Sequence, residues 1–196
     1  MVIEEVPRRT LAGRNVLHQS KITVPPVTGM PRPRLVALVE QGVQRRLTVV
    51  SAPAGWGKTT LVAEWAHQTD LPVAWLDLEE ADNDPLRFFE AVAAALANIH
   101  PLRLDDVLTM LRTPEMVGEE VIDQAIISAI EELPGPTAIV LDDFHLLVGP
   151  EQLRSVARVV ERMPPWVHLI LECFLFDSAN QPVFLPHANG SLPGAQ

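Results

Sequence analysis

The amino-acid sequence predicts an α/β fold in which helices cover both faces of an open parallel sheet, giving three layers. Three observations carry this prediction. Four short apolar segments have the length and β-branched content of buried strands, segments of helical periodicity separate them, and no internal repeat is present. The chain has 196 residues, of which 47% are hydrophobic and 20% charged, and this composition is typical of one globular domain.

The predicted strands are apolar runs bounded by turn residues, and they cover residues 47–52, 72–78, 137–143 and 166–171. The predicted helices alternate with them and cover residues 35–43, 59–68, 86–99, 119–133 and a segment beginning near Pro150. A polar turn over residues 81–85 should precede the third helix, with Asp84 as its N-cap and Pro85 at its first position.

Three regions follow from this pattern. Residues 1–34 form a proline-rich extended lead-in, residues 35–171 form the α/β core, and residues 172–196 form an irregular tail of different character. Within the core, the stretch from 100 to 118 is weakly patterned. The sheet is expected to be incomplete at its C-terminal end, because no fifth strand follows.

Charge and hydropathy exclude several classes of protein. The net charge is −10, with basic residues concentrated in residues 1–58 and acidic residues in excess after them. We therefore expect no extended basic surface of the kind that binds DNA. No apolar run has the length of a membrane helix, and the N-terminus lacks a signal-peptide pattern, so we expect a cytoplasmic protein. The single Cys173 has no companion for a disulfide or metal site and is given no role.

The segment SAPAGWGKTT, residues 51–60, matches the phosphate-loop pattern G-x-x-x-x-G-K-[ST] except that Ala52 replaces the first glycine. Such a loop turns backbone N–H groups toward phosphates, its lysine reaches the β- and γ-phosphates, and its hydroxyl binds Mg²⁺. The alternative is an ordinary strand-to-helix turn. The candidate phosphate-binding residues are Ala54, Gly55, Trp56, Gly57, Lys58, Thr59 and Thr60.

Asp142 and Asp143 follow the apolar run TAIVL at a strand end, where ligands of open parallel sheets bind. We expect Asp142 to hold Mg²⁺ together with Thr59, and Asp143 to orient or deprotonate an attacking water. The alternative is a solvated pair at the end of a strand. His145 is either within reach of a γ-phosphate or a local hydrogen-bonding residue. Residues 77–84 either approach a substrate or a switch partner, or they supply turn and cap chemistry.

Five segments, in this order, carry a resemblance to a known family: SKITVPP, MPRPRL, SAPAGWGKTTL, WLDLEEADNDPLRFFEAVAAAL and IVLDDFHLL. They resemble the N-terminal nucleotide-binding domain of the large MalT-like, LuxR-type transcriptional regulators, which are STAND-class signalling ATPases of the P-loop family. The resemblance implies an ATP and Mg²⁺ site with Lys58 and Asp143 as catalytic residues. It also implies that Arg32 and Arg34 lie near the adenine base, and that the strand order is 5-1-4-3-2.

The chain departs from that family after Leu171. A member would continue with a short Ser-Arg type segment whose arginine senses the γ-phosphate, whereas Glu172, Cys173 and Phe174 follow here. The winged helix, helical-repeat sensor and C-terminal helix-turn-helix of the family are also missing from this sequence. A truncation or a change of reading frame is the expected explanation.

The leading interpretation is an ATP-binding switch domain of such a regulator, with weak ATPase activity at most, no membrane partner and no direct DNA binding. Self-association through the domain stays open. One alternative is a small P-loop kinase with lid arginines among Arg154, Arg158 and Arg162. The other is a non-catalytic interaction fragment of a truncated regulator.

Overall fold

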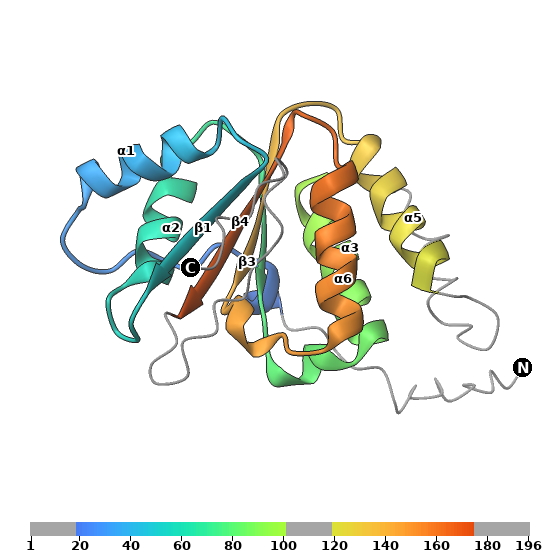
Figure 1. The fold of residues 1–196 in the computed structure, drawn as a ribbon. Helices are drawn as coiled ribbons and strands as arrows, with labels where there is room; N and C mark the ends of the chain where they lie inside the picture. The colour runs from blue at the N-terminus through green and yellow to red at the C-terminus, as the bar shows by residue number, and fades with distance from the viewer. Residues whose placement is uncertain (1–18, 101–118, 175–196) are drawn as a thin grey trace, which may run out of the picture.

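The structure is a computed structural model that describes residues 19–100 and 119–174 (Figure 1). Most of the predicted lead-in, the weakly patterned stretch and the tail beyond residue 174 lie outside the described residues.

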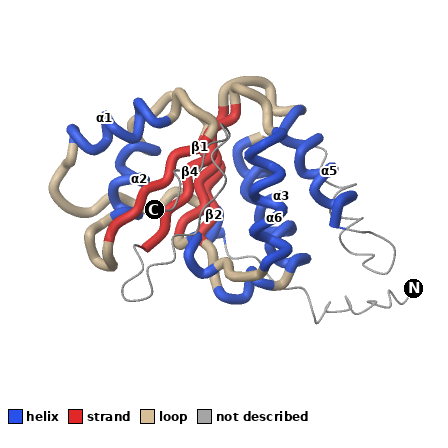
Figure 2. The backbone as a smooth tube through the Cα atoms, in the orientation of Figure 1, coloured by secondary structure: helices blue, strands red, loops and turns tan. Residues whose placement is uncertain are grey.

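Four parallel strands form the sheet, in the order β1-β4-β3-β2. They are β1 (Leu47–Ala52), β2 (Val73–Asp77), β3 (Thr137–Asp142) and β4 (Val167–Phe174). The last strand in the chain is therefore inserted between β1 and β3 (Figure 1). Figure 2 shows the strands, in red, between helices on both sides. The predicted order is confirmed for these four strands.

Helices cover both faces of the sheet (Figure 1). One face packs against α1 (Pro33–Gly42) and α2 (Lys58–Ala66). The other face packs against α3 (Pro85–Ile99), α5 (Glu119–Glu131) and α6 (Pro150–Arg162). The three-layer α/β/α architecture predicted from the sequence is confirmed. No helix of the described residues has the length and apolar character that crossing a bilayer requires.

The two central strands explain why the sequence is apolar without alternation. Val140 and Leu141 are consecutive in β3, and both are buried, one in each of the two hydrophobic cores. Successive side chains of a strand point to opposite faces, so a sheet covered on both sides needs apolar residues at every position. Ile170 and Leu171 repeat this arrangement in β4.

Several element boundaries differ from the predictions. Helix α1 begins at Pro33, two residues earlier than predicted, because proline at the first helical position needs no N–H partner. Helix α2 begins at Lys58 and ends at Ala66. Two segments expected to be extended or a simple turn contain single 3₁₀ turns, at Gln19–Ile22 and Glu80–Asn83.

Strand β4 ends at Phe174, so the predicted end at Leu171 was wrong by three residues. The extension follows from pairing with β1, in which Val50, Ser51 and Ala52 lie beside Glu172, Cys173 and Phe174. Continuing the ladder satisfies backbone groups that would otherwise be left unpaired. The first three residues of the predicted irregular tail therefore belong to the sheet.

The cap of α3 gives a test of the fold. Asp84 accepts a hydrogen bond from the backbone N–H of Arg87 at 3.0 Å, as predicted for an N-cap. We expect Asp84→Ala to lower the free energy of unfolding by about 1 kcal/mol in chemical denaturation, because the first turn loses this acceptor. Asp84→Asn retains the acceptor and is the control. Equal stability of Asp84→Ala and the wild type would contradict the assignment.

Candidate functional site

The carboxyl ends of the four described strands lie at one edge of the sheet, because the strands are parallel (Figure 1). The loop after β1 leads directly into α2. The ends of the other strands bring four carboxylates to the same edge, from Asp77, Asp142, Asp143 and Glu172. This edge is where the sequence predicted a site.

The loop between β1 and α2 depends on two glycines with positive φ, Gly55 at 77° and Gly57 at 73°. Glycine adopts such angles without steric cost. Gly57 is the N-cap of α2, so the first-turn N–H groups of the helix, beginning at Lys58, have no carbonyl partner within the helix. Such groups, together with the helix dipole, favour an anion. Trp56 is 67% exposed at the tip of this loop.

Arg32 makes hydrogen bonds to the backbone carbonyl groups of this loop. Its Nη1 donates to the carbonyl oxygens of Trp56 at 2.9 Å and Gly57 at 3.4 Å. Its backbone N–H donates to both carboxylate oxygens of Glu64, each at 3.1 Å. A Cβ atom at Gly57 would lie 2.7 Å from the end of the Arg32 side chain, which could shift, so the positive φ is what favours glycine at this position.

The adenine contact expected of Arg32 and Arg34 stays a prediction. Arg34 is exposed in the first turn of α1.

The Thr59 hydroxyl lies between two carboxylates from neighbouring strands. Its Oγ1 is 3.3 Å from Asp142 Oδ1 and 2.9 Å from Glu172 Oε1. Asp142 Oδ1 also accepts the backbone N–H of Asp143 at 2.9 Å, and Asp143 has φ 52°, which turns the chain out of β3. The structure thus brings Thr59 and Asp142 together, as their predicted shared role requires.

Lys58 is almost fully buried, and its ammonium group packs on an aromatic ring. The Nζ atom lies 4.0 Å from the centre of the Phe174 ring, which is a cation–π contact. The same ring meets His145 edge-to-face, with ring centres 3.9 Å apart. The predicted proximity of His145 to this edge is therefore seen, although its nearest carboxylate contact, to Asp143, is 3.8 Å long.

Burial and mutual repulsion raise the pKa values of three carboxyl groups, those of Asp77, Asp142 and Glu172. Burial, and then the charge of Asp142, raise the pKa of Glu172 to about 9. Burial also raises the pKa of Asp142, and it is the main cause that raises the pKa of Asp77 to about 6. Burial lowers the pKa of His145 and so favours its neutral form. Near neutral pH, the Asp142 and Glu172 pair therefore retains a proton.

Glu172 and Phe174 were not predicted as site residues. The sequence contained a signal for Glu172, since it directly follows an apolar strand whose parallel neighbours end in aspartates and a phosphate loop. No sequence pattern indicated that the Phe174 ring would pack on Lys58, because this contact depends on how far β4 extends.

Residues 77–84 supply turn and cap chemistry, the second of the two predicted alternatives. Asp82 accepts the backbone N–H of Glu79 at 2.7 Å and forms a buried ion pair with Lys21 at 2.7 Å. Asn83 links this segment to the segment after β3. Its Oδ1 accepts from the N–H groups of Val148 and Gly149 at 2.7 and 2.8 Å, and its Nδ2 donates to the Leu146 carbonyl at 2.8 Å.

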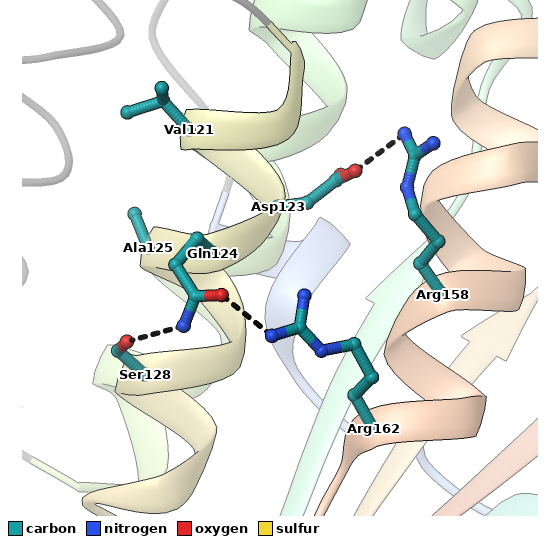
Figure 3. Close-up of a pocket in the computed structure, with 7 residues that line it drawn as sticks. All are labelled: Val121, Asp123, Gln124, Ala125, Ser128, Arg158 and Arg162. Atoms are coloured by element: carbon teal, nitrogen blue, oxygen red, sulfur yellow. Dashed lines mark hydrogen bonds and ion pairs between the residues drawn. The ribbon is translucent and has the colours of Figure 1, made fainter.

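A cavity of about 580 Å³ lies between α5 and α6, away from the carboxyl edge of the sheet (Figure 3). Arg158 and Arg162 of α6 reach toward α5, where Arg158 pairs with Asp123 at 2.5 Å and Arg162 donates to Gln124 at 2.8 Å. The kinase alternative required these arginines in a lid over the phosphates. Their partners on α5 disfavour that role.

Comparison with solved structures defines the class of fold. The chain is similar to a Walker-type ATPase of Pyrococcus abyssi, with a TM-score of 0.52 and 15% identity, over 73% of this chain and 45% of the other. The described chain therefore has the P-loop α/β/α fold, as the sequence predicted.

Comparison with curated proteins gives the relatives. The chain is 29% identical over 141 residues to the HTH-type transcriptional regulator MalT of Yersinia enterocolitica. It is 30% identical over 141 residues to MalT of Serratia proteamaculans and 27% identical over 134 residues to MalT of Vibrio campbellii. These matches span 71%, 71% and 68% of this chain, but 15% of each relative. The resemblance to the MalT-like regulators is confirmed, and no family model matches the chain.

The raised pKa of Glu172 predicts a pH-dependent stability. The folded chain retains a proton that the unfolded chain releases, so the free energy of unfolding falls as the pH rises from the ordinary carboxyl range toward about 9. Glu172→Gln has no ionisable group there and keeps an acceptor for Thr59. We expect its melting temperature in metal-free buffer to fall less than that of the wild type between about pH 5 and about pH 8.

The control is Asp70→Asn, which removes a carboxylate just before β2, at the opposite edge of the sheet. Parallel melting curves for Glu172→Gln and the wild type across this pH range would show that Glu172 is ionised in the folded chain.

Proposed function

We propose that this chain is the ATP-binding switch domain of a MalT-like transcriptional regulator of the STAND class, with slow or no hydrolysis. The observation that carries the proposal is the meeting of two chain segments at the carboxyl edge of the sheet. The glycine loop places Lys58 and Thr59 at the start of α2, and the Thr59 hydroxyl lies 3.3 Å from the Asp142 carboxylate at the end of β3. A phosphate loop and an acidic residue at a strand end can contact the same nucleotide only when they lie this close together.

The residues at the edge fit a triphosphate in their chemistry. The loop from Ala54 to Gly57 and the first turn of α2, including Thr60, would supply backbone N–H groups to the phosphate oxygens. Lys58 would add a positive charge at the β- and γ-phosphates. Arg32 holds the loop through its carbonyl groups and leaves the opposite, N–H side to the ligand.

The donor set also fits Mg²⁺. The Thr59 hydroxyl and the Asp142 carboxylate are oxygen ligands of the kind that Mg²⁺ prefers, and their oxygen atoms already lie close together. When bound, the ion would neutralise charge on the phosphate oxygens. Asp143, whose side chain is 39% exposed, would orient a water molecule and accept its proton as the water attacks the γ-phosphoryl group, releasing ADP and phosphate.

Slow hydrolysis follows from what occupies the end of β4. The family resemblance places a γ-phosphate-sensing arginine shortly after Leu171, where Glu172, Cys173 and Phe174 follow in this chain. A phenylalanine supplies no positive charge to the transferring phosphoryl group, and such charge is a large part of catalysis in this class. We therefore expect the domain to bind ATP and to hydrolyse it slowly, so that nucleotide binding rather than hydrolysis carries its function.

The remaining functions of a regulator would lie outside this chain, which spans 15% of the length of its MalT relatives. We propose that DNA is recognised by a helix-turn-helix region of the longer protein and that this domain contributes ATP-dependent self-association in the cytoplasm. The acidic character of residues 59–196 supports the absence of direct DNA binding here.

Lys58 gives the first test. We expect Lys58→Met to weaken Mg-ATP binding by about tenfold to hundredfold in isothermal titration calorimetry, because a charged hydrogen bond to phosphate is lost. Methionine preserves the buried stem of the side chain. Arg45→Ala is the matched control, since it removes one positive charge just before β1, at the opposite edge of the sheet. Unchanged affinity of Lys58→Met would overturn the proposed site.

Phe174 gives a second test, because its ring already contacts the ammonium group that would bind the phosphates. We expect Phe174→Ala to bind Mg-ATP about threefold to tenfold more tightly than the wild type. In the variant, Lys58 no longer has to give up the free energy of the cation–π contact when it binds the phosphates. Phe174→Leu keeps apolar bulk without the aromatic face and separates the electrostatic contribution from the steric one. Weaker binding by Phe174→Ala would mean that the ring supports the nucleotide rather than competing with it.

A further inference from the structure

Three carboxylates converge beside Thr59 in an arrangement that a phosphate loop does not itself require. One oxygen atom from each of Asp142, Asp143 and Glu172 lies within 4.8 Å of the others. Asp142 is 3% exposed and Glu172 is 1% exposed, so two of the three carboxylates are removed from water. Neighbouring buried carboxylates repel one another unless a proton or a cation lies between them.

Glu172 has an unused oxygen atom in this cluster. Its Oε1 accepts the Thr59 hydroxyl at 2.9 Å, whereas its Oε2 is buried without a hydrogen-bond partner among the described residues. A buried oxygen atom without a partner is costly, and a bound cation is one way to satisfy it. Glu172 also contacts the same hydroxyl as Asp142, so both carboxylates face one point.

The spacing of the oxygen atoms suits a divalent ion. An octahedral ion with metal–oxygen distances of about 2.1 Å separates its ligand oxygens by about 3 Å for neighbours and about 4.2 Å for opposite ligands. The 4.8 Å limit on the carboxylate oxygens, and the 2.9 Å and 3.3 Å separations at Thr59, lie close to this range. Small side-chain rotations would bring the oxygens to one centre.

We propose that Glu172 is a protein ligand of a divalent cation, such as Mg²⁺ or Mn²⁺, and that it lets the site bind this cation before any nucleotide arrives. In the proposed nucleotide site, on which this inference rests, the phosphates complete the shell of an ion that the protein holds through Thr59 and Asp142. When no nucleotide is bound, the carboxylate oxygens of Glu172 and Asp143 would take the place of the phosphate oxygens as ligands of the cation. Cation and nucleotide would then bind in sequence rather than as one complex.

Direct binding of Mn²⁺ to the full chain without nucleotide tests the inference. Electron paramagnetic resonance of free Mn²⁺, with Mg²⁺ as competitor, gives the stoichiometry and affinity. We expect one Mn²⁺ per chain for the wild type and an affinity at least about tenfold weaker for Glu172→Gln, because one charged ligand is lost. Asp143→Asn should weaken binding as well, and Asp70→Asn, at the other edge of the sheet, should not.

The outcomes separate this inference from the proposed function. Absence of Mn²⁺ binding by the wild type, or equal affinity of Glu172→Gln, overturns the inference even where Mg-ATP binds in a Lys58-dependent manner. Tight, Glu172-dependent Mn²⁺ binding by a chain that does not bind ATP upholds the cation site and overturns the nucleotide site.

Discussion

The parallel alignment of the strands is the constraint on which the rest of the structure depends. Because every strand runs in the same direction, every strand end that carries a polar side chain delivers it to one edge, and helices must cover both faces. The insertion of β4 between β1 and β3 makes this edge crowded. The phosphate-type loop and Asp142 then have Glu172 as an immediate neighbour of both.

Crowding at the edge produces two opposing charge environments only a few residues apart along β4. Glu172 places a second buried carboxyl group beside Asp142, whereas Phe174 offers its ring face to the ammonium group of Lys58. The ring contact favours the positive charge of Lys58, whereas the neighbouring carboxyl groups disfavour negative charge on each other. A ligand of this edge must therefore replace interactions that the protein already makes, and its affinity is the difference between the new contacts and these.

The sequence was sufficient for most of the fold because the signals were local. Strand β1 has the predicted bounds, and Asp84 caps α3 as expected, since both depend on residues adjacent in the chain. The boundary of β4 depends instead on pairing with β1, which lies more than a hundred residues earlier in the chain. The apolar pattern of the sequence does not reveal this pairing. The phosphate-loop pattern and Asp142 were predicted as site residues from local sequence patterns, whereas the positions of Glu172 and Phe174 depend on the register of two distant strands.

The Asn83 amide has a mechanical consequence for the fold. It holds Leu146, Val148 and Gly149 through one planar group, while its own carbonyl oxygen accepts from the Gln152 side chain of α6. These hydrogen bonds join the turn before α3 to the segment that follows β3 and to the start of α6 through a single residue. A displacement of any one of the three segments would therefore strain bonds to the other two.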